Sequence, residues 1–164
     1  MSGVTFDIDN AIAGAMSGTI AGVAFALAMH VDMRVFNNRL DDFRLLGELG
    51  PGAGHWRAKG IAVHAANSAG LGIVYTLVAD RLFGPAWLRG LTYAIIENTL
   101  LWPLTFLLDK RHPAILAGRL PRLNQPAAIA QEHLRHALYG MVLGWVYPRM
   151  RARQRRRSDA RGSA

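Results

Sequence analysis

The feature that most constrains this chain is a run of twenty-one residues without a formal charge, residues 11–31. A helix needs about twenty predominantly apolar residues to cross some 30 Å of hydrocarbon, so the run predicts a membrane span. The composition agrees, because only 18% of the residues are charged, against about 25% in ordinary globular domains. A cleaved secretory signal is the rival interpretation, but such a signal begins with basic residues, and the first ten positions offer only Asp7 and Asp9.

Three further stretches are long and apolar enough to cross, residues 60–82, 87–108 and 127–147. The fourth span is the weakest, because acidic, basic and histidine side chains crowd its first half, and without it the protein has three spans. Gly84-Pro85 makes the turn between spans two and three tight, which predicts that these two helices are antiparallel neighbours. We therefore expect an all-α polytopic membrane protein, with residues 1–148 forming one bundle of four transmembrane helices.

The remaining segments are polar. Residues 32–59 form a loop in which a short amphipathic helix is expected, because four apolar side chains recur there at helical spacing. These side chains are Phe36, Leu40, Phe43 and Leu46. Residues 149–164 show no apolar periodicity, which predicts a disordered, arginine-rich tail.

The tail carries most of the net charge of +8, since seven arginines lie among the last sixteen residues with one acid, Asp159. A basic cluster directly after a span favours anionic lipid headgroups. We expect no nucleic-acid partner, because the tail has no aromatic residue on which bases could stack. The predicted lipid-binding residues are Arg149, Arg151, Arg153, Arg155, Arg156 and Arg157.

The basic residues do not decide the orientation. In a four-span arrangement they number nine on each side of the membrane, so the positive-inside rule gives a tie. The density of the tail cluster favours both termini in the cytoplasm.

Small residues mark the helix faces expected to pack closely. Gly14, Gly18 and Gly22 recur at four-residue spacing in the first span, and this spacing lets two backbones approach in lipid. Gly72, Gly140 and Gly144 are the further packing candidates. The partner of the first face is another span of this chain or a second copy, since the spacing is the same for both.

Spans two and four share a pattern that predicts an internal repeat. His64-x7-Gly72-x-Val74-Tyr75 recurs as His136-x7-Gly144-x-Val146-Tyr147 at an offset of seventy-two residues. Two helical hairpins of common origin produce such a match, and a chance match is the alternative, because Gly and Tyr are ordinary in spans. The repeat places Tyr75 and Tyr147 at one membrane interface, as belt aromatics.

These motifs resemble the YagU-like family of small bacterial inner-membrane proteins. The resemblance covers roughly residues 14–147 and rests on short motifs in every span. They are the glycine face of the first span, His64, Gly72, Tyr75 and Asp80 in the second, Trp87, Gly90 and Pro103 in the third, and Glu132 and His136 opening the fourth. The long first loop departs from the family pattern. The resemblance implies a multi-pass protein of the bacterial cytoplasmic membrane and brings no catalytic residues with it.

One ionisable residue falls near the middle of a span. Glu97 lies nine residues into the third span beside Asn98, and an intramembrane carboxyl is a candidate functional site by default. Antiparallel third and fourth spans place Glu97 within about one turn of His136. The alternative is a protonated Glu97 that only hydrogen-bonds between helices as part of their packing.

The histidines allow two kinds of chemistry. His64 and His136 are expected at one depth, where facing imidazoles could ligate a haem or, with Glu132, a metal ion. A proton relay through Glu97, His136 and Glu132 also has the right residue types. The structural alternative is an exposed Glu132–Arg135 pair, with the arginine extending to the interface and the histidines in water. We commit to no cofactor and no metal.

Enzyme motifs are missing from the sequence: it has no cysteine, no phosphate loop, no Gly-x-Ser-x-Gly and no His-Glu-x-x-His. We therefore expect a non-enzymatic membrane protein that acts through helix packing and interaction, either as a homo-oligomer or with a partner membrane subunit. The alternatives are a small proton-coupled transporter or channel centred on Glu97 and His136, and a haem- or metal-binding membrane subunit using His64 and His136.

Overall fold

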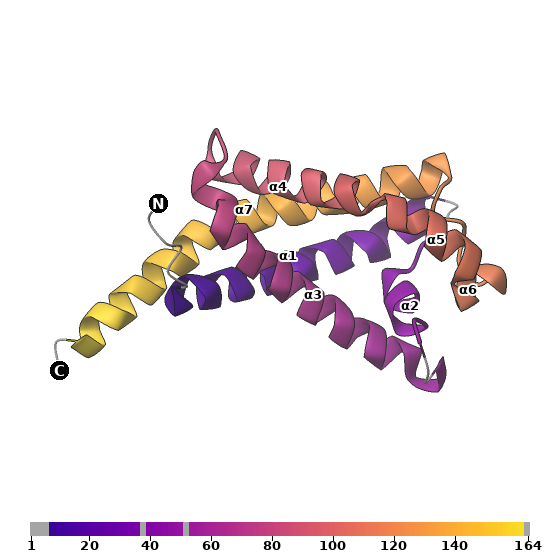
Figure 1. The fold of residues 1–164 in the computed structure, drawn as a ribbon, viewed down its shortest axis with the longest axis horizontal. Helices are drawn as coiled ribbons and strands as arrows, with labels where there is room; N and C mark the ends of the chain where they lie inside the picture. Colours follow the sequence, from indigo (N-terminus) through magenta and orange to yellow (C-terminus); the bar gives the residue numbers. More distant parts are fainter. Residues whose placement is uncertain (1–6, 37–38, 51–52, 163–164) are drawn as a thin grey trace.

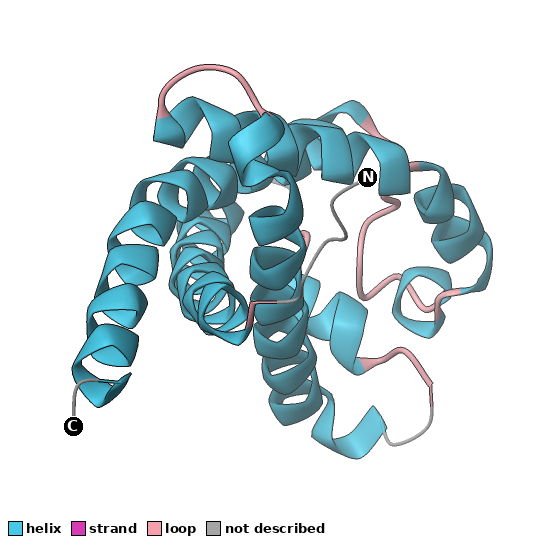
Figure 2. Cartoon of the chain, turned by 60° about the vertical axis from the view of Figure 1, so that its left-hand side comes forward, coloured by secondary structure: helices cyan, strands magenta, loops and turns pink. Residues whose placement is uncertain are grey.

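The computed structural model describes residues 7–36, 39–50 and 53–162, and all the regular structure in these ranges is helical (Figures 1 and 2). The elements in chain order are α1 (Ile8–Val35), α2 (Asp42–Gly47), η1 (Ala53–His55), α3 (Trp56–Val78), η2 (Ala79–Arg81), α4 (Ala86–Leu101), α5 (Pro103–Arg111), α6 (Pro113–Leu116) and α7 (Pro126–Gly162). The predicted all-α class is confirmed within the described residues.

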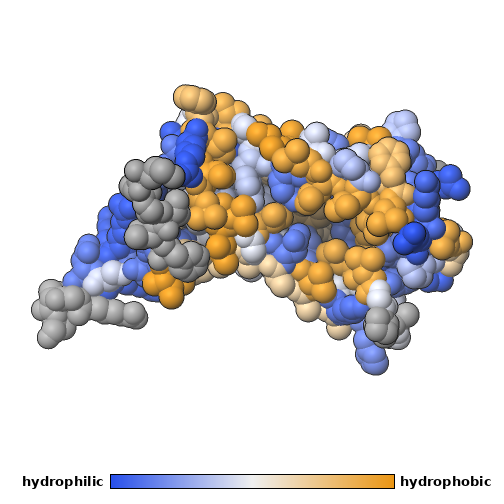
Figure 3. All heavy atoms as spheres, in the orientation of Figure 1, coloured by the Kyte–Doolittle hydropathy of each residue, from blue (hydrophilic) through white to orange (hydrophobic). Residues whose placement is uncertain are grey.

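Two helices, α1 and α3, are long and apolar enough to cross a membrane. A third span exists if α4 and α5 are counted together across their 49° bend. The bend falls at Pro103, which has no N–H to donate and whose ring crowds the preceding turn. The surface agrees with a membrane setting, because apolar side chains cover the middle of the face in Figure 3 and polar ones gather at both ends.

The long helices pack in a different order from the one expected. α3 packs on α1 and crosses it, α4 packs on α7, and α1 and α7 run alongside each other (Figure 1). α3 and α4 diverge from the Gly84-Pro85 turn, so the expected pair of antiparallel neighbours does not form. The turn instead connects the α1–α3 pair to the α4–α7 pair.

Glycines explain why α3 packs on α1. Gly14 and Gly18 lie against Gly72, and a Cβ atom added at Gly18 would collide with the carbonyl oxygen of Ser68. Gly22 faces the side chain of Ser68, where an added Cβ would come within 2.6 Å of its Cβ. No residue larger than glycine fits at this backbone contact, which gives α1 and α3 their close approach.

Glycines also allow close backbone contact between α4 and α7. Gly90 of α4 lies between Gly140 and Gly144, and an added Cβ at Gly90 would come within 2.6 Å of the Gly144 nitrogen. Gly140 and Gly144 therefore pack as the sequence suggested, whereas their partner Gly90 was not among the predicted packing residues. Since Gly90 and Ala94 of α4 are already packed against α7, α4 has no small-residue face left for α3.

The arginine-rich segment is helical, in contrast to the expected disordered tail. α7 continues through Pro148 to Gly162, and Pro148 removes only one backbone hydrogen bond. Contacts with the rest of the chain hold the extension: Arg151 pairs with Asp80 at 3.0 Å, and Ser158 donates a hydrogen bond to Asp9. Arginine is itself a good helix former.

The loop between α1 and α3 folds into a compact layer with α5 and α6. Its helix, α2, is shorter than the expected amphipathic stretch, and Leu40 is fully buried with Ala114 and Leu123 instead of lying in the membrane interface. His112 bonds the carbonyl of Leu45 at 2.8 Å and ties this layer together.

Candidate functional site

The most buried charged side chain is Arg135 of α7, which has no exposed surface. Its Nε and one terminal nitrogen donate to the two carboxylate oxygens of Asp32, both at 2.6 Å. The other terminal nitrogen donates to Asp42 at 2.7 Å and to Glu132 at 3.1 Å. Arg135 thus joins the end of α1, the loop helix α2 and α7 in one network.

The expected exposed Glu132–Arg135 pair is therefore wrong. The two residues do pair, but Arg135 points into the protein, because Asp32 and Asp42 supply carboxylates that an arginine reaching the interface would lack. A guanidinium offers five donors in a planar fork, which suits it to bind several carboxylates at once.

Three carboxyls surround this single guanidinium, and two of them share one of its nitrogens. Asp42 and Glu132 accept from the same terminal nitrogen of Arg135, so the two carboxyls are close neighbours. Burial raises the pKa of Asp42 above its usual range, in opposition to the stabilising charge of Arg135. A raised pKa favours the protonated form of Asp42, which reduces the negative charge that the network has to bury.

His136 continues the network toward the middle of the bundle. Its Nδ1 lies 2.9 Å from the backbone carbonyl of Glu132 and 3.7 Å from the Glu132 carboxyl. The carbonyl can only accept, so Nδ1 carries the hydrogen and Nε2 carries the lone pair. Nε2 lies 3.7 Å from the carboxyl of Glu97.

Glu97 also lines an apolar groove between α3 and α4, where the two helices diverge. The groove has a volume of about 430 Å³, and Glu97 is the only charged residue among its lining side chains. Asn98 is buried next to it in sequence, and its Nδ2 has no hydrogen-bond partner within the described residues. Glu97 thus connects the interior network to an apolar groove at the surface.

His64 and His136 lie near each other and line one pocket of about 140 Å³. The ring of Phe25 contacts both, with centroid distances of 5.3 Å to His64 and 5.2 Å to His136. His64 Nε2 is engaged with the carbonyl of Gly22 at 3.0 Å. The described residues contain no group of three potential metal-ligating side chains. Ligation of a haem iron by His64 Nε2, as considered from the sequence, would require the bond to Gly22 to break.

A column of tyrosines leads from Glu97 to the opposite end of the bundle. Tyr93 is one turn before Glu97 on α4, its ring lies 5.3 Å from that of Tyr75, and Tyr75 lies 5.4 Å from Tyr147. Tyr75 and Tyr147 lie at one level, as expected, but they are buried and do not form an exposed aromatic belt. Their rings meet inside the bundle, and the exposed aromatics at this end are Phe83, Trp87 and Trp145.

The sequence singled out Glu97, Asn98, His64, Glu132 and His136, and four of them lie in or beside one network. Asp32, Asp42 and Arg135 complete that network and were missed as site residues. The available signal was weak, because an aspartate at the end of a span is ordinary and Asp42 lies in a loop whose fold the sequence does not specify.

The predicted lipid-binding arginines divide into two groups. Arg149 stacks on Trp145 at 4.0 Å, and Arg151 and Arg155 line a pocket with Arg89. Arg153, Arg156 and Arg157 are exposed.

Comparison with known proteins gives no match, whether with family models, with curated proteins or with solved structures. The resemblance to the YagU-like family accordingly stays a prediction.

Proposed function

We propose that this chain is a non-enzymatic, four-span protein of the bacterial cytoplasmic membrane that conducts protons or couples proton movement to transport. The observation that carries the proposal is the line of titratable groups Glu97, His136, Glu132 and Asp42. Glu97 and Glu132 each lie 3.7 Å from His136, and Glu132 and Asp42 share one nitrogen of Arg135. α7 serves as the fourth span, because it packs along both α1 and α4 and carries the central members of the line.

The proton path follows from the hydrogen positions. A protonated Glu97 gives its proton to the lone pair on His136 Nε2, and the imidazole releases the Nδ1 hydrogen to the Glu132 carboxylate. Heavy atoms exchange a proton at about 2.6–3.2 Å. Each gap of 3.7 Å therefore closes by a small side-chain rotation or is bridged by one water.

Arg135 sets the charge at the inner end of this path. Its positive charge stabilises the anionic form of the carboxyl pair, while the second carboxylate disfavours double ionisation. Glu132 can therefore carry the proton that His136 releases. Asp42, which belongs to the loop layer, passes it toward the polar end of the molecule.

The other half of the path runs along the tyrosine column. Tyr93 is one turn from Glu97, and Tyr75 and Tyr147 follow toward the pocket that contains Asp80 and Arg89. Hydroxyl groups both donate and accept, so with intervening waters they can extend a proton path. Together the two halves support a route along the length of the bundle.

The test is proton flux into liposomes that contain the purified protein and a pH-sensitive dye, driven by a potassium diffusion potential. Glu97→Gln keeps the shape of the side chain but cannot release a proton, so we expect flux to fall by at least about a hundredfold. Glu48→Gln is the matched control, because Glu48 is a carboxylate of the loop layer outside the line. Wild-type flux in Glu97→Gln contradicts the proposal.

His136→Gln gives a second, independent measurement, since it removes the only imidazole in the line. If Glu97→Gln abolishes flux and His136→Gln leaves it unchanged, the path through His136 is wrong. The amount and size of reconstituted protein, measured alongside, separate a loss of conduction from a loss of folding.

A further inference from the structure

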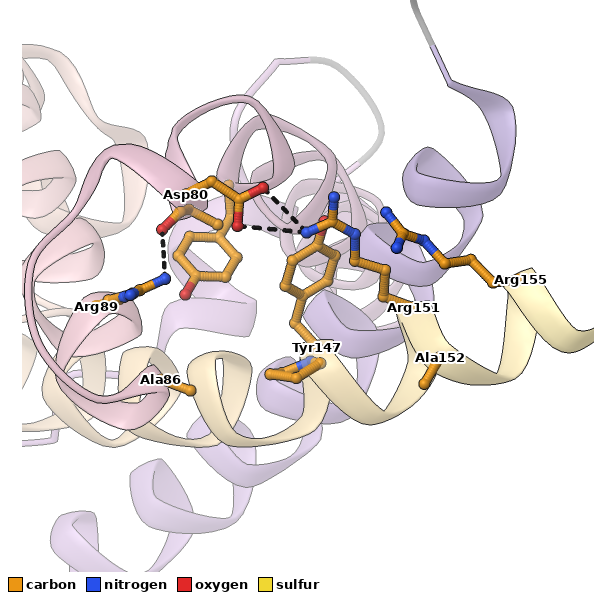
Figure 4. Close-up of a pocket in the computed structure, with 10 residues that line it drawn as sticks. Asp80, Ala86, Arg89, Tyr147, Arg151, Ala152 and Arg155 are labelled. Carbon is orange, nitrogen blue, oxygen red and sulfur yellow. Dashed lines mark hydrogen bonds and ion pairs between the residues drawn. The ribbon is translucent and has the colours of Figure 1, made fainter.

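A second polar site lies at the other end of the bundle, where the α3–α4 turn meets the arginine-rich part of α7. It is a pocket of about 350 Å³ (Figure 4). Its charged lining residues are Asp80, Arg89, Arg151 and Arg155. Three guanidiniums against one carboxylate give the lining a formal charge of +2.

The arginines come from two elements and converge. In Figure 4, Arg89 of α4 lies on one side of the pocket and Arg151 and Arg155 of α7 lie on the other, with Tyr147 between them. Arg89 is fixed by its Nε, which donates to the carbonyl of Gly84 at 2.7 Å. Small residues, Ala79, Ala86 and Ala152, leave the space open.

Asp80 satisfies only part of this donor set. It accepts two hydrogen bonds from a single terminal nitrogen of Arg151, at 3.0 and 3.3 Å. The Nε of Arg151 is buried and has no hydrogen-bond partner within the described residues. Arg155 is exposed and forms no hydrogen bond or ion pair within them. The pocket therefore has more guanidinium donors than its single carboxylate, Asp80, accepts.

The surroundings place this donor set at a membrane surface. Phe83 is 93% exposed, and Trp87 and Trp145 are about half exposed at the same end of the bundle. Aromatic side chains of this kind gather at the level of the lipid headgroups. Arg149, stacked on Trp145, marks the same level.

We propose that this pocket binds the phosphate of an anionic lipid headgroup, and that its best ligand is a phosphomonoester. A dianionic phosphate matches the +2 lining, and its oxygens match the forked donors of arginine. Tyr75 and Tyr147 add uncharged hydroxyl donors to the lining. None of the groups from Asp42 to Glu97 contributes to the site, which shares only Tyr75 and Tyr147 with the tyrosine column.

The probe is phosphatidic acid, titrated into the purified full-length protein in a neutral detergent, with native mass spectrometry counting bound lipid. We expect Arg155→Gln to weaken binding by about tenfold, the factor for one lost charge-assisted hydrogen bond. Arg89→Gln combined with Arg155→Gln is expected to abolish it. Arg155→Gln alone keeps the test valid if the double variant fails to fold, because Arg155 makes no bond within the described fold.

Arg153→Gln with Arg156→Gln is the matched control, since it removes two charges from the same helix outside the pocket. We expect unchanged binding in this variant. Equal losses in the pocket and control variants overturn the proposal, because they indicate attraction to the tail as a whole. No retention of phosphatidic acid by the wild-type protein overturns it as well.

Competition between inorganic phosphate and phosphatidic acid is the last measurement. If it competes with phosphatidic acid only at much higher concentration, the lipid is the ligand. If it binds as tightly as phosphatidic acid, the pocket is a site for free phosphate and the lipid assignment is overturned.

Discussion

Arg135 and Asp32 form a two-point ion pair, with donor–acceptor distances of 2.6 Å for both hydrogen bonds, across 103 residues of sequence. The pair fixes the last turn of α1 against the first half of α7. It also holds α7 in the rotation that presents His136 to Glu97. The packing of the helices and the geometry of the proposed proton path therefore depend on the same contact.

We expect Asp32→Asn to lower the free energy of unfolding by about 3–5 kcal/mol, because breaking one partner of a buried ion pair leaves an uncompensated charge. Thermal unfolding in detergent measures the effect. Asp159→Asn is the control, since Asp159 is an exposed acid on the α7 extension. Equal melting temperatures for Asp32→Asn and the wild-type protein contradict this prediction.

The glycine contact between α1 and α3 gives a second prediction. Gly18→Ala places a Cβ atom 2.9 Å from the Cα of Gly72 and against the Ser68 carbonyl, so the two helices must separate. Overpacking of this kind costs about 1–3 kcal/mol. We expect a matching fall in the thermal stability of the purified protein.

Gly70→Ala is the matched control for Gly18→Ala. Gly70 is a glycine of α3 with no atom within 4 Å of an added Cβ, so alanine fits and is expected to stabilise the helix by about 0.5–1 kcal/mol. If both variants melt alike, the close approach at Gly18 does not contribute to stability.

Sequence reasoning located the individual helices better than their pairing. The runs that predicted spans 11–31 and 60–82 became α1 and α3 with ends displaced by a few residues, because charge-free length is a local property. The pairing of α3 with α1 was not predicted, since a short turn suggested an α3–α4 hairpin. The glycines of both faces were visible, but glycine spacing says that a helix packs closely and does not identify its partner.

The candidate site was also predictable only in part. Glu97 and His136 were linked by counting residues inward along two helices, and this works wherever helices are regular. Arg135 was misplaced because its surroundings come from Asp32 and Asp42, and the sequence does not specify how their loop folds back onto α7. Helicity after Pro148 was missed because the contacts that support it, with Asp80 and Asp9, come from residues 71 and 149 positions away in the sequence.

The bond between His64 and Gly22 predicts that His64 and His136 bind no haem. A haem held by both imidazoles needs a free ring nitrogen on each, and His64 Nε2 is engaged with the carbonyl of Gly22 at 3.0 Å. We expect purified protein, with or without added haemin, to show no Soret band that depends on the two histidines. A band that is lost in both His64→Ala and His136→Ala would contradict this prediction.

The loop layer predicts a dependence of stability on acid. Glu48 accepts a hydrogen bond from Arg119 at 2.5 Å, and this bond lowers the pKa of Glu48 below its usual value of about 4.3. A lowered pKa in the folded state means that the carboxylate stabilises the fold fully above about pH 4.3 and that this contribution is lost as the pH falls through the folded-state pKa. We expect wild-type protein to melt above Glu48→Gln at pH 6 and the difference to shrink toward pH 3. A difference that is constant over this range would mean that the charge of Glu48 does not contribute, and Arg119→Gln, which removes the other partner, is expected to show the same convergence.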